Sequence, residues 1–240
     1  MSTYQSVRLA CRACGLEQPL RYALTINLGR HPALEEEILA GTLNRLRCVE
    51  CAEITEFDEP VAVIDFARRW WLTCFPKREL VHYRALAVAV RHDFVQNILA
   101  GPERVHPLLE DPWQVRLVFG LDALREKLLV WRSGIDEAAL EALKLALVQS
   151  EPARAFAPIM LQSAQDDQLE LRASDGVIVL PRNLLSAPPP SRFNRDELLC
   201  DPFVSYQRWL IVSEPLSSMS SASTILATPR SSAPSRLRDQ

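Results

Sequence analysis

The sequence predicts an α+β protein in which a mixed sheet packs against helices. Three observations support this class. Segments that alternate between apolar and polar residues and are rich in strand formers occupy much of the chain up to residue 76. Amphipathic segments of helical period follow up to about residue 150. Alternation then returns around the Ser-Asp-Gly turn at 174–176, which is typical of a hairpin and predicts a small C-terminal α/β appendage.

Composition and charge restrict the class of protein. Of the 240 residues, 48% are hydrophobic and 24% are charged, as in ordinary globular domains. The net charge of −3 creates no global field that would attract a polyanion. The chain shows neither an apolar core of signal-peptide length near its start nor a stretch long enough to span a membrane. We therefore expect a soluble, cytoplasmic protein with no membrane partner, in which disulfides are uncommon.

Two Cys-x-x-Cys pairs are the main chemical signal. Cys11 and Cys14 form the first pair, and Cys48 and Cys51 form the second. A turn of this spacing brings two sulfurs close together, and two such turns complete the four-thiolate shell that structural Zn²⁺ prefers. In a cytosolic protein, paired Cys-x-x-Cys units are more often metal sites than crosslinks. The sequence therefore predicts that these four cysteines bind a structural Zn²⁺ ion.

The segment between the pairs must contain structure of its own, because it is longer than the linker of a compact zinc ribbon. Residues 21–29 alternate as a strand, and residues 31–41 are typical of a short helix that begins near Pro32 and ends at Gly41. Residues 43–48 predict a returning strand. The predicted architecture is thus a pair of zinc-ribbon-like hairpins with an inserted strand–helix–strand.

The same cysteines allow alternatives to structural zinc. A thioredoxin-like redox pair needs a Cys-x-x-Cys at a helix N-terminus, and neither pair precedes a helical pattern. Four unligated core thiols would not explain two pairs of identical spacing. Catalytic zinc usually keeps an open position, which a fourth cysteine closes. Cys74 and Cys200 stand alone in apolar segments and are interpreted as small buried hydrophobes.

The first pair, in "CRACG", and the following "INLGRHPALEEEILAGTLNRLRCVEC" resemble the N-terminal part of CpXC-domain proteins, a bacterial and archaeal family of uncharacterised function. The segment "VRLVFGLDALREKLLVWRSGIDEAALEALKLAL" at 115–147 is similar to a second part of that family, so the resemblance covers about residues 8–150. It implies a zinc-binding fold and no reaction. This chain departs from the family pattern at Arg12 and Val49, where the family has proline, and at Ala52, where it has glycine.

The middle of the chain predicts further elements. Residues 53–76 are interpreted as two extended runs with a turn near 58–60, and residues 77–101 as a helix. A strand over 113–119 and helices over 122–131 and 136–148 follow, the last capped by Asp136. Glu126 and Lys127 are expected to make surface contacts. A possible binding surface, in which an exposed Trp stacks on a base or grips a peptide, is formed by Arg68, Arg69, Trp70 and Trp71; the alternative packs both rings under the following helix.

The predicted domains are a CpXC-like zinc-binding domain at 1–150, a small α/β appendage packed on it at 151–212, and a disordered Ser/Pro-rich tail at 213–240. Within the tail, the segment "STILA" could become ordered on a partner as a donated strand or a short helix.

The expected function is a structural-zinc adaptor module whose partner is another protein. The sequence shows no Gly-x-Ser-x-Gly, P-loop or Gly-x-Gly-x-x-Gly motif, which favours a protein that is not an enzyme. The alternative is a zinc-ribbon protein that binds nucleic acid, because arginines cluster around the cysteines, although glutamates nearly balance them. A thiol redox protein or a zinc enzyme is the least favoured alternative.

Overall fold

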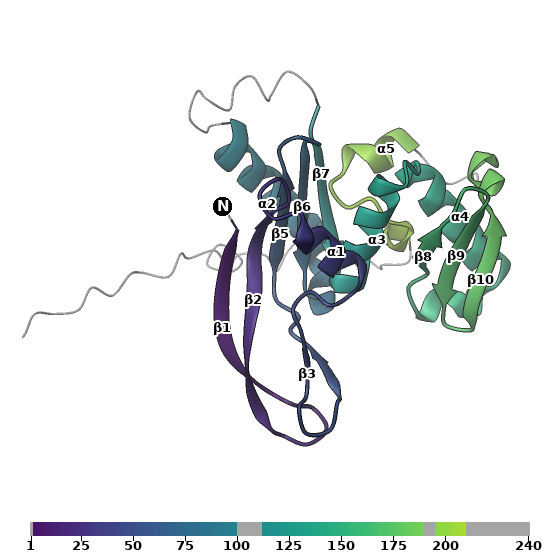
Figure 1. Cartoon of the computed structure of the whole chain (residues 1–240). Coiled ribbons are helices and arrows are strands. Elements are labelled where there is room, and N and C mark those ends of the chain that lie inside the picture. Colours follow the sequence, from purple (N-terminus) through teal and green to yellow (C-terminus); the bar gives the residue numbers. More distant parts are fainter. Residues whose placement is uncertain (1, 100–111, 190–194, 210–240) are drawn as a thin grey trace, which may run out of the picture.

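A computed structural model describes residues 2–99, 112–189 and 195–209 of the chain. The described part is a mixed α+β structure, as predicted, with a larger and a smaller sheet flanked by helices (Figure 1). The predicted tail at 213–240 lies outside the described residues. None of the helices within the described residues is long and apolar enough to span a membrane.

The larger sheet has five strands in the order β1-β2-β5-β6-β7. β1 pairs with β2 and β5 with β6 in antiparallel fashion, whereas β2 pairs with β5 and β6 with β7 in parallel, so the sheet is mixed as predicted. The strands are β1 (Thr3–Ala10), β2 (Glu17–Asn27), β5 (Val61–Asp65), β6 (Trp70–Phe75) and β7 (Gln114–Phe119).

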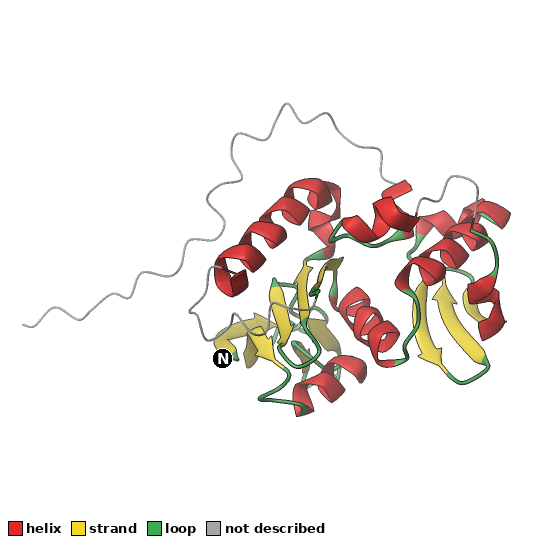
Figure 2. Ribbon diagram, turned by 90° about the horizontal axis from the view of Figure 1, so that it is seen from above, coloured by secondary structure: helices red, strands yellow, loops and turns green. Residues whose placement is uncertain are grey.

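Helices cover both faces of this sheet, which explains why its central strands are apolar on both sides (Figure 2). On one face, α1 (Ala33–Leu39) and α3 (Leu121–Arg132) pack on a cluster that includes Ile26, Leu72 and Trp70. On the other face, α2 (Tyr83–Phe94) packs on a cluster that includes Trp71 and Leu117. The parallel crossovers through α1 and α2 place these helices against the sheet.

The predicted helices are largely confirmed. The segment predicted as a helix over 77–101 begins with the 3₁₀ turn η1 (Lys77–His82), continues as α2 and ends in the described part with the π-helical turn η2 (Val95–Leu99). The helices predicted over 122–131 and 136–148 correspond to α3 and to α4 (Glu137–Ser150). The Asp136 carboxylate accepts a hydrogen bond from the Ala139 N–H and caps α4 as predicted.

One extended run was predicted wrongly. Residues 61–76 form two antiparallel strands, β5 and β6, with a turn between them that includes Arg69 at φ 56°. The turn contains neither Gly nor Pro, the residues that usually mark such a reversal, so the sequence carried little signal for it. Trp70 and Trp71 nevertheless lie on opposite faces of the strand, as predicted.

The C-terminal part forms a three-stranded antiparallel sheet in the order β10-β9-β8. Its strands are β8 (Met160–Ala164), β9 (Gln168–Ala173) and β10 (Gly176–Pro181), and β9 and β10 are the hairpin predicted around the Ser-Asp-Gly turn. One hydrophobic cluster joins this sheet to α3 and α4, so the core continues across residue 150. The predicted domain boundaries at 150 and 212 stay predictions. Short helical segments complete this part: η4 (Pro152–Phe156), η5 (Arg182–Ser186), α5 (Arg195–Cys200) and η6 (Tyr206–Trp209).

Candidate metal centre

The four predicted cysteines lie at the tips of two hairpins. The first hairpin is β1–β2, whose turn, residues 11–16, is called the first knuckle. The second is formed by β3 (Arg45–Arg47) and β4 (Ile54–Glu56), whose turn, residues 48–53, is the second knuckle. The two tips lie together at one end of the molecule (Figure 1). The insertion between them runs through the end of β2, α1 and β3, as the predicted strand–helix–strand.

The two knuckles have equivalent backbones. In the first, the Gly15 N–H donates to the Cys11 carbonyl at 2.9 Å, and in the second the Ala52 N–H donates to the Cys48 carbonyl at 3.0 Å. Gly15 has φ 75° and Ala52 has φ 59°, so Ala52 adopts the left-handed conformation that favours glycine. The turn geometry is therefore kept despite the substitution, at the cost of local strain.

The four sulfur atoms form a compact group. The Sγ atoms of Cys11 and Cys51 are 3.5 Å apart, as are those of Cys14 and Cys48. The Sγ atoms of Cys14 and Cys51 are 3.7 Å apart, and all four lie within 4.8 Å of one another. A tetrahedral ion with metal–sulfur bonds of about 2.3 Å requires sulfurs about 3.8 Å apart. The arrangement therefore fits one four-coordinate ion, and within the described residues these cysteines are free thiols.

Backbone amides point at the inner sulfur of each knuckle. Amides of Cys14 and Ala13 donate to the Cys11 sulfur and lower its pKa to about 6, and the buried Cys48 sulfur receives the amides of Cys51 and Glu50, which also lower its pKa. Amides that stabilise a thiolate are what a metal–thiolate site requires. These two cysteines are thus prepared to act as anionic ligands.

The outer sulfurs, of Cys14 and Cys51, are more exposed. Although the Leu16 amide favours the Cys14 thiolate, contact with the Cys48 sulfur and burial together raise the Cys14 pKa. In the same way the Glu53 amide favours the Cys51 thiolate, but contact with Cys11 and burial raise the Cys51 pKa to about 12. Four adjacent thiolates repel one another, and a divalent cation between them would remove that repulsion.

Two polar contacts hold the second hairpin against the first. The Asn44 side chain accepts a hydrogen bond from the Ala23 N–H at 2.8 Å and donates one to the Ala23 carbonyl at 3.1 Å, so it pairs with β2 as a strand residue would. Near the tips, the Gln18 side-chain oxygen accepts a hydrogen bond from the Val49 N–H at 3.0 Å. These contacts place the second knuckle beside the first.

The residues around Asn44 set the direction in which the chain leaves α1 and enters the second hairpin. Gly41, at φ 70°, ends the helix, Leu43 is buried, and Asn44 is itself left-handed at φ 52°. Arg45 then forms ion pairs with Glu56 on β4 at 2.8 Å and with Asp122 on α3 at 2.9 Å. The base of the hairpin is therefore fixed to the body of the protein. Residues 39–44, Leu-Ala-Gly-Thr-Leu-Asn, belong to the segment that carries the family resemblance, but the sequence did not indicate their role in aligning the knuckles.

A buried group of charged residues was missed from the sequence. Lys144 lies 2.8 Å from both Glu126 and Glu141, and Arg116 lies 2.7 Å from Glu137. Lys127 approaches Glu137 at 3.5 Å, which corrects the expectation that Glu126 and Lys127 make surface contacts. We call this group the ionic cluster: Arg116, Glu126, Lys127, Glu137, Glu141 and Lys144.

The ionic cluster ties the C-terminal segment to α3 and α4. Glu141 accepts a hydrogen bond from the Tyr206 N–H at 2.7 Å, Glu126 accepts one from the Leu161 N–H, and Glu137 accepts one from the Trp131 indole. The carboxylates and ammonium groups are paired, which is the arrangement of a structural network. Glu126 lies on α3 and its partner Lys144 on α4. The sequence did not show how these two helices pack, so it could not identify this pair.

The four residues of the possible binding surface occupy buried or bonded positions. Trp70 and Trp71 are 8% and 6% exposed, the first against Trp131 and the second against Phe94. Arg68 pairs with Asp65 and with Glu35, each at 2.6 Å, and stacks on the Trp70 ring. Arg69 occupies the left-handed turn position. Both rings are thus buried rather than exposed for stacking. Only Trp71 packs under the following helix, α2, as the alternative interpretation expected for both rings, whereas Trp70 packs on the opposite face with α3.

Comparison with known proteins supports the resemblance seen in the sequence. The family model described as "CpXC protein" matches residues 9–144, a span that holds both knuckles and most of the ionic cluster's two helices. Searches of curated proteins and of solved structures returned no match. Because the matched span exceeds half of the chain and contains all four clustered cysteines, the protein belongs to the CpXC family.

Proposed function

We propose that the knuckles bind one structural Zn²⁺ ion through Cys11, Cys14, Cys48 and Cys51, and that the domain so organised is an adaptor that binds another protein. The proposal rests on the four sulfur atoms that lie within 4.8 Å of one another at the tips of two hairpins. Four thiolates fill a tetrahedral shell, so no coordination position is left for a substrate or an activated water.

The need for a metal follows from the size of the second hairpin. β3 and β4 have only three residues each, and a hairpin of that length is unstable in water without further support. Zinc bound to a site of this kind contributes about 10–16 kcal/mol of apparent free energy. That amount exceeds the contribution of the contacts at Asn44 and Gln18, each worth about 1 kcal/mol. The ion would therefore be the main stabiliser of the tip.

The tip carries exposed apolar side chains that could contact a partner. Leu16 and Val49 are 39% and 82% exposed, and Ile54, directly after the second knuckle, is 52% exposed. Large apolar residues at neighbouring exposed positions indicate interaction sites more often than scattered ones do. In an adaptor, the zinc ion would hold these side chains in a fixed arrangement and take no part in chemistry.

Nucleic-acid binding is the alternative, and the arginines near the knuckles are the relevant residues. Arg8 pairs with Glu17 at 3.1 Å, Arg45 is engaged by Glu56 and Asp122, and Arg21 lies over the Tyr4 ring. Arginines already paired with carboxylates have less charge to offer to phosphates. The pairing of Arg8 and Arg45 favours a protein partner, whereas Arg12 and Arg47 beside the cysteines are exposed. Affinity for RNA or DNA that falls steeply with salt would reverse the preference.

Metal binding is tested by elemental analysis of the purified protein and by the absorption spectrum after Co²⁺ replaces the native ion. We expect one zinc per chain and the spectrum of a tetrahedral four-sulfur cobalt site. Cys48→Ser should lose the metal, whereas Cys74→Ser, which changes a buried thiol outside the site, should keep it. A metal-free protein with an easily formed disulfide would instead favour a thiol redox function, and a water ligand on the metal would favour an enzyme.

The adaptor role is tested by crosslinking and mass spectrometry with tip variants. Val49→Asp and Ile54→Asp should lose specific crosslinks to a partner while keeping their zinc. Val88→Asp is the matched control, because Val88 is 68% exposed on α2 and far from the knuckles in sequence. Equal crosslinks in all three variants would contradict a partner-binding role for the tip.

A further inference from the structure

The edge strand β10 has features of an unfilled pairing site. Ala173 and Gly176 flank a two-residue turn. In an antiparallel pair only every second residue exchanges N–H and C=O hydrogen bonds with the partner strand, so the intervening residues of β10 direct these groups away from β9. Val177 and Val179 are the outward residues, and their side chains are 65% and 54% exposed. In the described part of the chain, β10 pairs only with β9. An apolar edge of this kind normally needs a cover.

Strand β7, at the other end of the larger sheet from β1, shows how this protein covers an edge strand. The Leu117 N–H of β7 donates to the Pro202 carbonyl at 2.9 Å, and Phe203 packs against Phe119 and Tyr83. A segment from near the C-terminal end of the described chain therefore lies along that edge. Among the other edge strands of the described part, β1 is largely polar on its exposed side and β8 lies against α3. β4 exposes one large apolar residue, Ile54, whereas β10 exposes two, Val177 and Val179.

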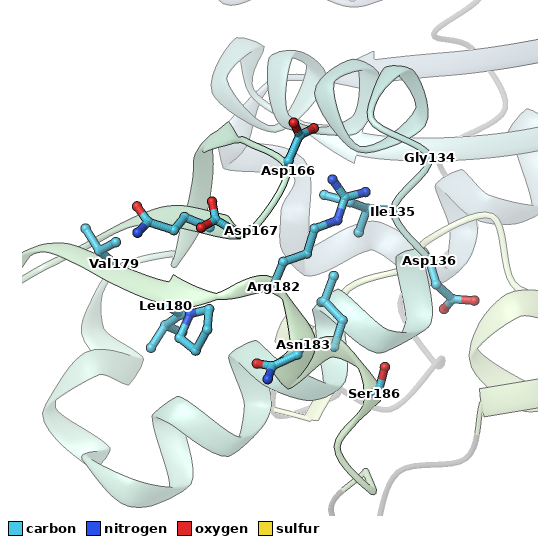
Figure 3. A pocket seen from close by; sticks show the side chains of 13 residues that line it. Gly134, Ile135, Asp136, Asp166, Asp167, Val179, Leu180, Arg182, Asn183 and Ser186 are labelled. Atoms are coloured by element: carbon cyan, nitrogen blue, oxygen red, sulfur yellow. The ribbon is translucent and has the colours of Figure 1, made fainter.

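A groove of about 750 Å³ lies at the C-terminal end of β10 (Figure 3). Its apolar lining residues are Val179, Leu180 and Pro181 of β10, together with Ile135 and Leu185. Its acidic lining residues are Asp136, Asp166 and Asp167, and its one lining cation is Arg182, which donates to the carbonyls of Ser133 and Gln165. Because Asp136 already pairs with Arg195 at 2.6 Å, Asp166 and Asp167 are the acidic groups available to a basic ligand.

The sequence that follows the described residues has matching chemistry. Residues 210–240 contain three arginines and two acidic residues, Glu214 and Asp239. They include the strand-forming segment 224–228, Thr-Ile-Leu-Ala-Thr, followed by Pro229 and Arg230. The chain can also reach the groove. Tyr206 belongs to the same hydrophobic cluster as Ile178 and Leu180 on β10, and the 14 residues after Trp209, 210–223, can span about 45 Å.

We propose that residues 224–228 of this chain add to β10 as a fourth, parallel strand, with Arg230 placed at Asp166 and Asp167. Only the parallel direction brings Arg230 to the acidic end of the groove, because β10 runs from Gly176 towards Pro181, which pairs with Gln168 beside Asp167. Pro229 has no N–H, so the added ladder ends before the arginine. Backbone bonds to Val177 and Val179 supply the affinity, and the ion pair fixes the register.

The test is amide hydrogen exchange resolved at single residues in the full chain. We expect the amides of Val177 and Val179 to exchange at least about tenfold faster in Leu226→Asp than in the unchanged protein. The matched control is Leu216→Asp, in the same tail but outside the segment, which should leave exchange unaltered. Ile178 and Leu180, whose amides bond to β9, should stay protected in every variant and so report an intact sheet.

Register is tested separately by charge reversal. Arg230→Glu should increase exchange at Val177 and Val179, and the added change Asp167→Arg should restore their protection. Equal exchange of these two amides in the unchanged protein and in Leu226→Asp would overturn the proposal. Protection that grows with protein concentration would overturn it as well, because it would mean that a second copy covers the edge.

Discussion

The Gln18 side chain accepts a hydrogen bond from the Val49 N–H at 3.0 Å, and this contact joins the first hairpin to the second knuckle. Val49 stands where the family pattern has proline, and proline has no N–H to donate. Valine at this position therefore supplies a donor that proline would lack, and the chain uses it between the knuckles. We expect this contact to compensate for the stiffness that a proline would give the turn.

Val49→Pro tests this compensation. The substitution removes the donor and leaves the buried Gln18 oxygen without it, which should lower the free energy of unfolding by about 1–3 kcal/mol relative to Val49→Ala. Alanine keeps the N–H and removes only an exposed side chain, so it isolates the hydrogen bond. Urea unfolding of the zinc-loaded protein measures the difference. If the proline variant equals or exceeds the alanine variant in stability, the contact contributes nothing.

A matched pair of substitutions tests the strain at Ala52. Because Ala52 has φ 59°, Ala52→Gly should raise the free energy of unfolding by up to about 1 kcal/mol. Gly15→Ala should lower it by a similar amount, since a Cβ at Gly15 meets nothing within 4 Å and only the backbone conformation at φ 75° is affected. Thermal unfolding of both zinc-loaded variants gives the comparison. Changes of the same sign would show that the knuckles are not equivalent.

Local signals in the sequence were sufficient for the knuckles and several helix ends. The Cys-x-x-Cys spacing specifies a turn through its own backbone bonds, and Asp136 caps α4 within a single turn, so neither depends on distant residues. The sequence predicted a hairpin at the first cysteine pair but gave no bounds for β1, because its polar, half-exposed pattern becomes a strand only by pairing with β2. The same dependence on distant partners hid the ionic cluster, since Glu126 and Lys144 lie on different helices.

Asn44 offers a test of whether the scaffold controls metal affinity. Asn44→Gly keeps the freedom to adopt φ 52° but removes both hydrogen bonds to Ala23, so the second knuckle loses its anchor to β2. We expect zinc affinity to fall by about 10- to 100-fold, as for other supporting residues of metal sites. Competition with a chromophoric chelator measures the affinity. Thr42→Gly, an exposed change in the same loop, is the control and should leave affinity nearly unchanged.

Lys144 is expected to be essential to the ionic cluster. Lys144→Met would leave Glu126 and Glu141 as adjacent buried carboxylates without their cation, at a cost of about 3–5 kcal/mol. Lys77→Met removes an exposed lysine that pairs with Asp122 at 3.4 Å and should cost less than about 1 kcal/mol. Urea unfolding separates the two outcomes. A small effect of Lys144→Met would mean that the carboxylates protonate at little cost, and that the cluster does not hold the C-terminal segment in place.

Glu137 gives the cluster a defined acid sensitivity. Although burial opposes ionisation, the charges of Lys127 and Arg116, together with hydrogen bonds from Arg116 and Trp131, lower its pKa to about 2 from an ordinary value of 4.5. Because the folded-state pKa is the lower one, the stabilisation is complete above pH 4.5 and is lost as the pH falls towards 2. Glu137→Gln should therefore be less stable than the unchanged protein by about 3 kcal/mol at neutral pH, and this difference should shrink below pH 4.5. Urea unfolding of both proteins without metal, over pH 7 to 2, measures the difference free of zinc release. A difference that stays constant across this range would show that Glu137 is not held as an anion by Arg116 and Lys127.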